Sequence, residues 1–174
     1  MRLDLPVMLV VLALAAAAQN LLPGMPGSPL KIPFLSGVVV YYALNRPLVM
    51  ALVAAAWGGW LIDSAGGLPG LCTSSFLLLL VLCLRPSRRL LLDGSFAGVV
   101  AAATVVALVQ TLWQLIWARL GLPGSVWRVA GDLVLLLPSG AIAGAAAYGL
   151  GHTLDRFAGN VKARAEMQER SLLG

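Results

Sequence analysis

Apolar residues gather in six stretches along the chain, and charged residues lie almost entirely between them. The stretches cover residues 5–22, 32–44, 47–62, 70–84, 94–117 and 129–151. A helix of about 20 apolar residues crosses a bilayer core of about 30 Å, and lipid forces the backbone to satisfy its own hydrogen bonds. The pattern therefore predicts an all-α integral membrane protein built as a bundle of six transmembrane helices.

The second stretch is too short to cross a bilayer alone. Its 13 residues, 32–44, give about 20 Å of helix. The segment before it, 23–29, contains three prolines and two glycines and cannot form a regular helix. We expect a short or broken span that is either completed by this irregular segment or shielded by neighbouring helices.

Lysine and arginine are distributed unevenly between the loops. With the N-terminus inside, the cytoplasmic side holds Arg2, Arg46, Arg85, Arg88, Arg89, Arg156, Lys162, Arg164 and Arg170, and the outer side holds Lys31, Arg119 and Arg128. Basic residues accumulate in cytoplasmic loops, so this split of nine to three predicts that both termini are cytoplasmic. The expected organisation is a six-span domain over residues 1–154 and a polar cytoplasmic tail over 155–174.

Composition agrees with a membrane protein. Hydrophobic residues make up 60% of the chain and charged residues 11%, against about 25% charged in a soluble domain. The net charge of +5 would suggest nucleic acid in a soluble protein, but here it reflects membrane topology, and no nucleic-acid partner is expected. Cys72 and Cys83 are 11 residues apart in one helical stretch, about 16 Å of rise, so we expect no disulfide between them.

Residue patterns of known catalytic centres are missing. The chain has one histidine, His152, and lacks the HExxH, G-x-S-x-G and P-loop motifs. Two isolated thiols do not make a metal site. The sequence therefore predicts a protein that is not an enzyme, with no catalytic residue, bound cofactor or metal.

Asp63 directly follows the third apolar stretch and is the main candidate for a polar contact. It lies at the C-terminal end of that stretch, where the helix dipole disfavours an anion. One alternative is a loop carboxylate that caps the fourth stretch or meets water. The other is a carboxylate that accepts hydrogen bonds from backbone N–H groups of the following glycine-rich turn or from a partner's side chain. A second candidate is the small-residue motif Gly140-x-x-x-Gly144. It predicts either close packing between helices inside the bundle or a surface that docks another protein's helix.

From Tyr41-Tyr42-Ala43-Leu44-Asn45-Arg46-Pro47 through Gly70, the chain resembles the bacterial rod shape-determining protein MreD family. The matching features are an aromatic-rich end of the second span, a short basic turn with proline, and a G-x-x-x-D-x-x-x-G stretch. Here that stretch is Gly59, Asp63 and Gly67, followed by Pro69-Gly70. The turn carries one basic residue, Arg46, where the family pattern is more basic.

The resemblance implies a non-catalytic scaffold of the cell-elongation machinery in the bacterial inner membrane. Its implied partners are the bitopic protein MreC and, through it, MreB, RodA and a class B penicillin-binding protein involved in peptidoglycan synthesis. The residues expected to dock a partner on the outer side are Asp63, Gly59, Gly66, Gly67 and Gly70. The basic residues of the cytoplasmic turns, expected to face lipid headgroups or a cytoplasmic partner, are Arg46, Arg85, Arg88 and Arg89.

A different class of protein fits the same span count. The substrate-binding S component of an energy-coupling-factor vitamin transporter is also a small six-span protein. The motif Ala13-x-x-x-Ala17 resembles the surface by which such subunits dock their coupling protein. The polar side chains that could hold a vitamin, however, are scattered along the chain, as Asn20, Gln110, Gln114 and Asp132.

Overall fold

The computed structural model describes residues 4–22, 31–66, 72–87, 95–119 and 126–157. This part of the chain forms six α-helices and no strand, which confirms the all-helical prediction. The helices are α1 (Asp4–Leu21), α2 (Phe34–Asn45), α3 (Leu48–Gly66), α4 (Cys72–Ser87), α5 (Phe96–Arg119) and α6 (Val126–Phe157). Each of the six apolar stretches therefore becomes one helix.

The turn between α2 and α3 follows directly from its sequence. Arg46 has φ −123° and ψ 165°, the extended conformation that is favoured before a proline. Its backbone N–H donates to the Tyr42 carbonyl at 2.9 Å and closes the last turn of α2. The Pro47 carbonyl accepts the first helical bond of α3, from the Ala51 N–H at 3.1 Å. Only two residues therefore separate two antiparallel helices.

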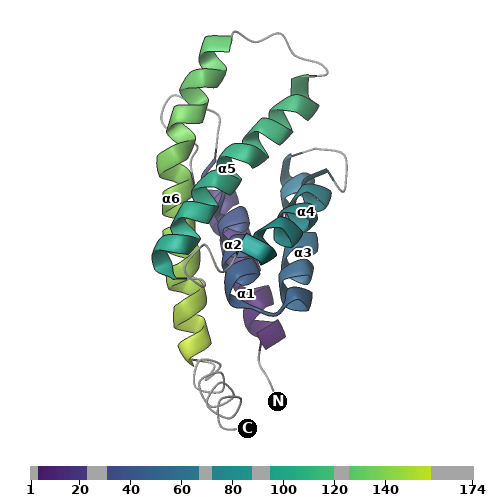
Figure 1. Cartoon of the computed structure of the whole chain (residues 1–174), viewed down its shortest axis with the longest axis vertical. Coiled ribbons are helices and arrows are strands. Elements are labelled where there is room, and N and C mark those ends of the chain that lie inside the picture. Colours follow the sequence, from purple (N-terminus) through teal and green to yellow (C-terminus); the bar gives the residue numbers. More distant parts are fainter. Residues whose placement is uncertain (1–3, 23–30, 67–71, 88–94, 120–125, 158–174) are drawn as a thin grey trace.

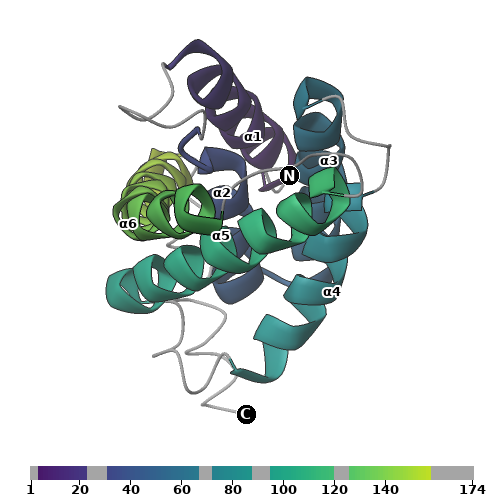
Figure 2. The ribbon, with the colours of Figure 1, turned by 90° about the horizontal axis from the view of Figure 1, so that it is seen from above.

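Helix α2 lies at the centre of the bundle (Figure 2). Ten consecutive residues, from Leu35 to Leu44, are buried, so the helix is covered on all sides. It packs against each of the other five helices. At Gly37 a Cβ atom would lie 2.7 Å from the backbone oxygen of Ala143, so the lack of a side chain lets α6 approach closely. The short second apolar helix is thus shielded by its neighbours, as one of the two sequence-based alternatives predicts.

Helices α5 and α6 form the most extensive pair (Figure 1). Gly140 and Gly144 lie one turn apart on α6 and face α5. A Cβ atom would lie 2.7 Å from the Cα of Thr104 at the first position and 2.9 Å from the Cα of Val100 at the second. This small-residue motif therefore packs two helices of the same chain together, and it is not left open for another protein.

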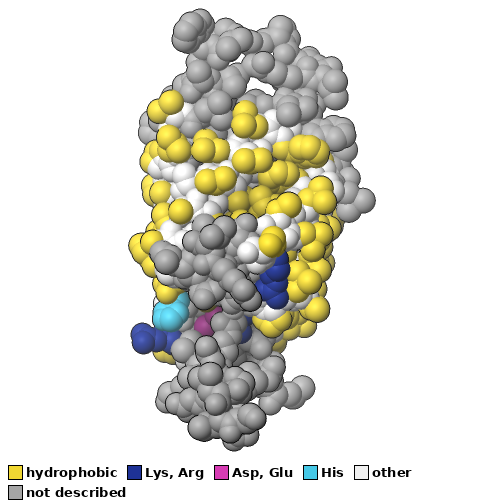
Figure 3. Space-filling model, in the orientation of Figure 1, with side chains coloured by type: hydrophobic (Ala, Val, Ile, Leu, Met, Phe, Trp, Pro, Cys, Tyr) yellow, Lys and Arg dark blue, Asp and Glu magenta, His cyan; other side chains and the backbone are white. Residues whose placement is uncertain are grey.

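The first helix begins and the last helix ends at the same end of the bundle, called here the lower end (Figure 1). Among the described residues, two helices are long and apolar enough to cross a membrane, over Leu48–Ala65 and Phe96–Trp113. Helices α1, α2 and α4 contain shorter apolar segments. Hydrophobic side chains cover the middle of the face shown in Figure 3, and charged side chains appear near its lower end.

Helices α3, α4 and α6 extend three or more residues past the C-terminal ends of their apolar stretches. Helix α3 continues to Gly66, α4 to Ser87 and α6 to Phe157. Asp155, which we expected to begin the polar tail, instead lies in the last turn of α6 and is buried. Its hydrogen-bond partners, described below, explain why the helix does not stop where the apolar residues stop. Cys72 and Cys83 form no disulfide, as expected.

Candidate functional site

Asp63 lies at the upper end of the bundle and is 1% exposed. Its carboxylate accepts hydrogen bonds from the backbone N–H of Thr73, at 2.9 Å and 3.0 Å to its two oxygens, and from that of Ser74 at 3.5 Å. These are N–H groups of the first turn of α4, which have no partner within their own helix. The positive end of the α4 dipole also stabilises the negative charge of the carboxylate. Asp63 therefore caps α4 and ties it to α3.

Gly59 lies one turn before Asp63 on α3, against the start of α4. A Cβ atom at this position would lie 2.6 Å from the backbone nitrogen of Ser74. Real side chains essentially never come that close, so the contact requires glycine. The Ser74 hydroxyl donates to the Ala56 carbonyl at 3.4 Å. Gly59 and Asp63 thus belong to one interface between α3 and α4.

The other predicted docking glycines lie at or beyond the limit of the described residues. Gly66 is the last residue of α3, and the surroundings of its side-chain position are not described. Gly67 and Gly70 lie outside the described residues, as do Arg88 and Arg89. Of the predicted docking set, the structure places Gly59 and Asp63 together.

A second group of polar side chains, the lower polar cluster, joins three helix ends and consists of Tyr41, Arg46, Arg85 and Asp155. Arg46 forms an ion pair with Asp155, and both side chains are about 95% buried, with relative exposures of 4% and 5%. The Tyr41 hydroxyl donates to the other carboxylate oxygen of Asp155 at 2.8 Å. The cluster therefore fixes the end of α2 to the end of α6.

Arg85 connects α4 to the same cluster. Its Nη1 donates to the Arg46 carbonyl at 2.9 Å, and its side chain is partly exposed. Arg46 and Arg85 were both expected to face lipid headgroups or a cytoplasmic partner. In the structure the Arg46 side chain is buried inside the bundle, and the Arg85 side chain is partly exposed.

One further polar pair lies between the two ends. The Ser36 hydroxyl on α2 donates to the side-chain oxygen of Gln110 on α5, and both residues are buried. Nearby along α2, the Leu35 N–H donates to the Gln19 side chain of α1 at 3.1 Å, which satisfies a free N–H of the first turn of α2. These bonds hold the central helix against two neighbours. Gln110, considered above as a vitamin ligand, is engaged in this contact.

Sequence reasoning missed the role of Tyr41 and Asp155 in the lower polar cluster. Arg46 and Asp155 are separated by 109 positions, and no local motif relates them. The available signal is topological: both residues are predicted at cytoplasmic helix ends, so opposite charges are expected at one level of the bundle. Ser36 and Gln110 lie on apolar stretches without any pattern that would pair them.

No protein-family model, curated protein or solved structure matches this chain.

Proposed function

We propose that the chain is a six-span inner-membrane scaffold of the bacterial cell-elongation machinery, which docks the membrane span of an MreC-like protein and helps to organise peptidoglycan synthesis. Through that partner it would associate with MreB, RodA and a class B penicillin-binding protein. The observation that carries the proposal is the separation of polar and apolar side chains between the inside and the outside of the bundle. The buried side chains of Asp63, Arg46, Asp155, Ser36 and Gln110 bond inside the bundle, and large apolar side chains face outward.

The stretch that resembles the MreD family is also the packing centre of the molecule. It includes the second half of the buried helix α2, the turn at Arg46, and the α3 interface with Gly59 and Asp63. Each of these features sets the position of one helix relative to another. Because Asp63 is buried, its role in docking would be to fix the angle between α3 and α4, rather than to touch the partner.

Large apolar side chains face outward on five helices, which suits both lipid and a partner's helix. Examples are Leu14 on α1, Trp57 and Trp60 on α3, Leu79 on α4 and Val105 on α5, each at least 48% exposed. A surface of this kind is an aggregation hazard in water but is the normal exterior of a protein in a bilayer. It supports placement of the whole bundle in the membrane, with both termini on the cytoplasmic side according to the distribution of basic residues.

The test is affinity purification of the full chain from its own cells in mild detergent, with mass spectrometry of proteins and small molecules. We expect an MreC-like protein and elongation synthases in the eluate. Asp63→Ala should lower the yield of that complex, and Asp63→Asn, which keeps an oxygen acceptor for α4, should restore most of it. A monomer without these proteins would refute the proposal.

One observation favours the alternative, a vitamin-transporter S component. Ala13 and Ala17 are both exposed on α1, so the Ala13-x-x-x-Ala17 surface is available to another helix. The same purification separates the two functions. An ATPase pair with a coupling membrane protein, or a stoichiometric vitamin, would identify the transporter subunit.

A further inference from the structure

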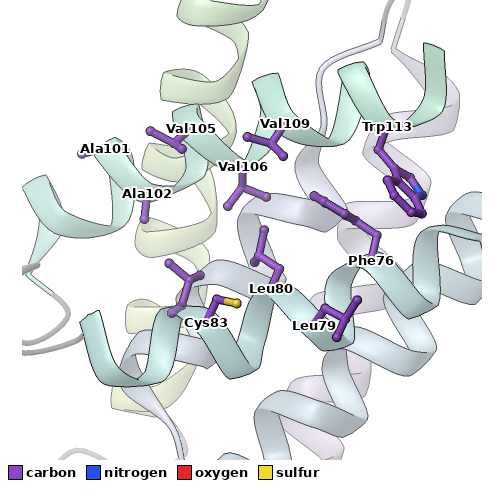
Figure 4. A pocket seen from close by; sticks show the side chains of 11 residues that line it. Phe76, Leu79, Leu80, Cys83, Ala101, Ala102, Val105, Val106, Val109 and Trp113 are labelled. Atoms are coloured by element: carbon purple, nitrogen blue, oxygen red, sulfur yellow. The ribbon is translucent and has the colours of Figure 1, made fainter. Parts of the chain in front are cut away.

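A groove of about 680 Å³ runs along the outside of the bundle between α4 and α5 (Figure 4). The two helices diverge there, so their facing side chains do not close the space between them. The eleven side chains that line the groove are of hydrophobic types, and the only polar atoms among them are the Cys83 thiol and the indole N–H of Trp113. Its lining includes the small residues Ala101 and Ala102. A ligand in this groove must therefore present hydrocarbon to it.

The upper end of the groove is closed by two aromatic rings. Phe76 of α4 and Trp113 of α5 stack across it, with ring centroids 5.8 Å apart and planes inclined by 24° (Figure 4). Along α4 the lining runs from Phe76 to Leu84, about 12 Å of helix, and along α5 from Ala101 to Trp113, about 18 Å. The groove is therefore about 12–18 Å long and ends at the Phe76–Trp113 pair.

A positive charge lies at the opposite, lower end. Arg85 directly follows Leu84, the last α4 residue of the lining. Its bond to the Arg46 carbonyl anchors the side chain to the lower polar cluster. A guanidinium has five N–H groups, so this bond leaves donors for a phosphate, which arginine binds well. Figure 3 shows a basic side chain next to the hydrophobic surface on this face of the molecule.

We propose that the groove binds one anionic phospholipid from the leaflet at the lower end of the bundle, with an acyl chain between α4 and α5 and the phosphate beside Arg85. The apolar lining suits a hydrocarbon acyl chain, and the Phe76–Trp113 pair would contact the end of that acyl chain. The guanidinium of Arg85 would bind the phosphate of the headgroup. A partner's transmembrane helix fits less well, because it would run the full thickness of the bilayer and meet the Phe76–Trp113 pair. The site adds a lipid ligand to the proposed scaffold and does not depend on the identity of any protein partner.

The test uses the purified full chain in detergent and native mass spectrometry with added phosphatidylglycerol or phosphatidylcholine. We expect a bound phosphatidylglycerol that is preferred over phosphatidylcholine. Arg85→Gln should weaken it about fivefold, which corresponds to about 1 kcal/mol for one basic residue near an anionic lipid. Ala101→Phe, which fills the groove from an exposed position, should remove the tightly bound lipid of either headgroup.

Two matched variants control for general effects. Arg156→Gln removes an exposed charge from the last turn of α6, and Ala13→Phe adds a ring at an exposed position of α1. Both should bind phosphatidylglycerol like the unmodified chain. Equal affinity for the two lipids, equal weakening by the two arginine variants, or unchanged binding in Ala101→Phe would each overturn the proposal. Loss of an MreC-like partner from Ala101→Phe with lipid binding intact would assign the groove to that partner's helix instead.

Discussion

Removal of either charge from the Arg46–Asp155 pair should strongly destabilise the bundle. Arg46→Met leaves the buried Asp155 carboxylate with the Tyr41 hydroxyl as its remaining described donor. Removing one partner from a buried ion pair typically costs about 3–5 kcal/mol, because the other charge stays buried without compensation. We expect Arg46→Met and Asp155→Leu each to lower the free energy of unfolding by about this amount.

The double variant separates an uncompensated charge from a general loss of packing. Replacing both members of a buried pair by apolar residues is often close to neutral. Arg46→Met combined with Asp155→Leu should therefore be more stable than either single variant. The measurement is unfolding of the purified protein in detergent, followed by tryptophan fluorescence during denaturant titration.

Arg156→Met is the matched control, since it removes an exposed charge one residue from Asp155. It should change stability by less than about 0.5 kcal/mol. Tyr41→Phe, which removes a single hydrogen bond to a charged group, should cost about 1.5–3 kcal/mol. If the two single variants of the ion pair were as stable as Arg156→Met, or if their costs simply added in the double variant, the reasoning would be refuted.

Three further predictions concern helix contacts, each measured by the same unfolding assay. Gly59→Ala should lower the free energy of unfolding by about 1–3 kcal/mol, because the added Cβ overpacks the interface between α3 and α4. Gly149→Ala, with no atom within 4 Å of its added Cβ, should be neutral or slightly stabilising. Equal effects of the two substitutions would contradict the close approach of α3 and α4 at Gly59. Asp63→Ala should cost about 0.5–2 kcal/mol as a lost helix cap and more than Asp63→Asn; the reverse order would exclude capping. Ser36→Ala should lower the free energy of unfolding by about 1 kcal/mol, and adding Gln110→Ala should lower it little further, because one hydrogen bond joins the two side chains. Additive losses would show that the two side chains stabilise the protein independently.

Hydrophobic periodicity predicted the helices because their apolar stretches are long and interrupted by strong breakers. Pro47 marks the start of α3, and the glycine-rich segment after residue 65 separates α3 from α4. The helix ends were harder to predict. Helix α6 continues to Phe157 because Asp155 finds Arg46 and Tyr41 inside the bundle, and this tertiary contact leaves no trace in hydropathy.

The candidate site could be predicted only in part. A carboxylate at the end of an apolar stretch must find donors, so Asp63 stood out, and capping of the fourth helix was one of the stated alternatives. That Gly59 lies against Ser74 depends on the crossing of α3 and α4, which no local pattern specifies. The role of Arg46 was missed because position alone indicated a lipid-facing charge, whereas its partner lies 109 residues away.

The enclosure of α2 has a consequence for biogenesis. Its 12 residues give about 18 Å of helix, well short of a bilayer core of about 30 Å, so lipid alone would not accommodate it well. In the proposed topology, α2 cannot be a stable, independently inserted segment that waits for later helices. The two-residue turn to α3 suits insertion of these helices together as a hairpin. Because α2 contacts all five other helices, its final environment exists only once α6 has been synthesised.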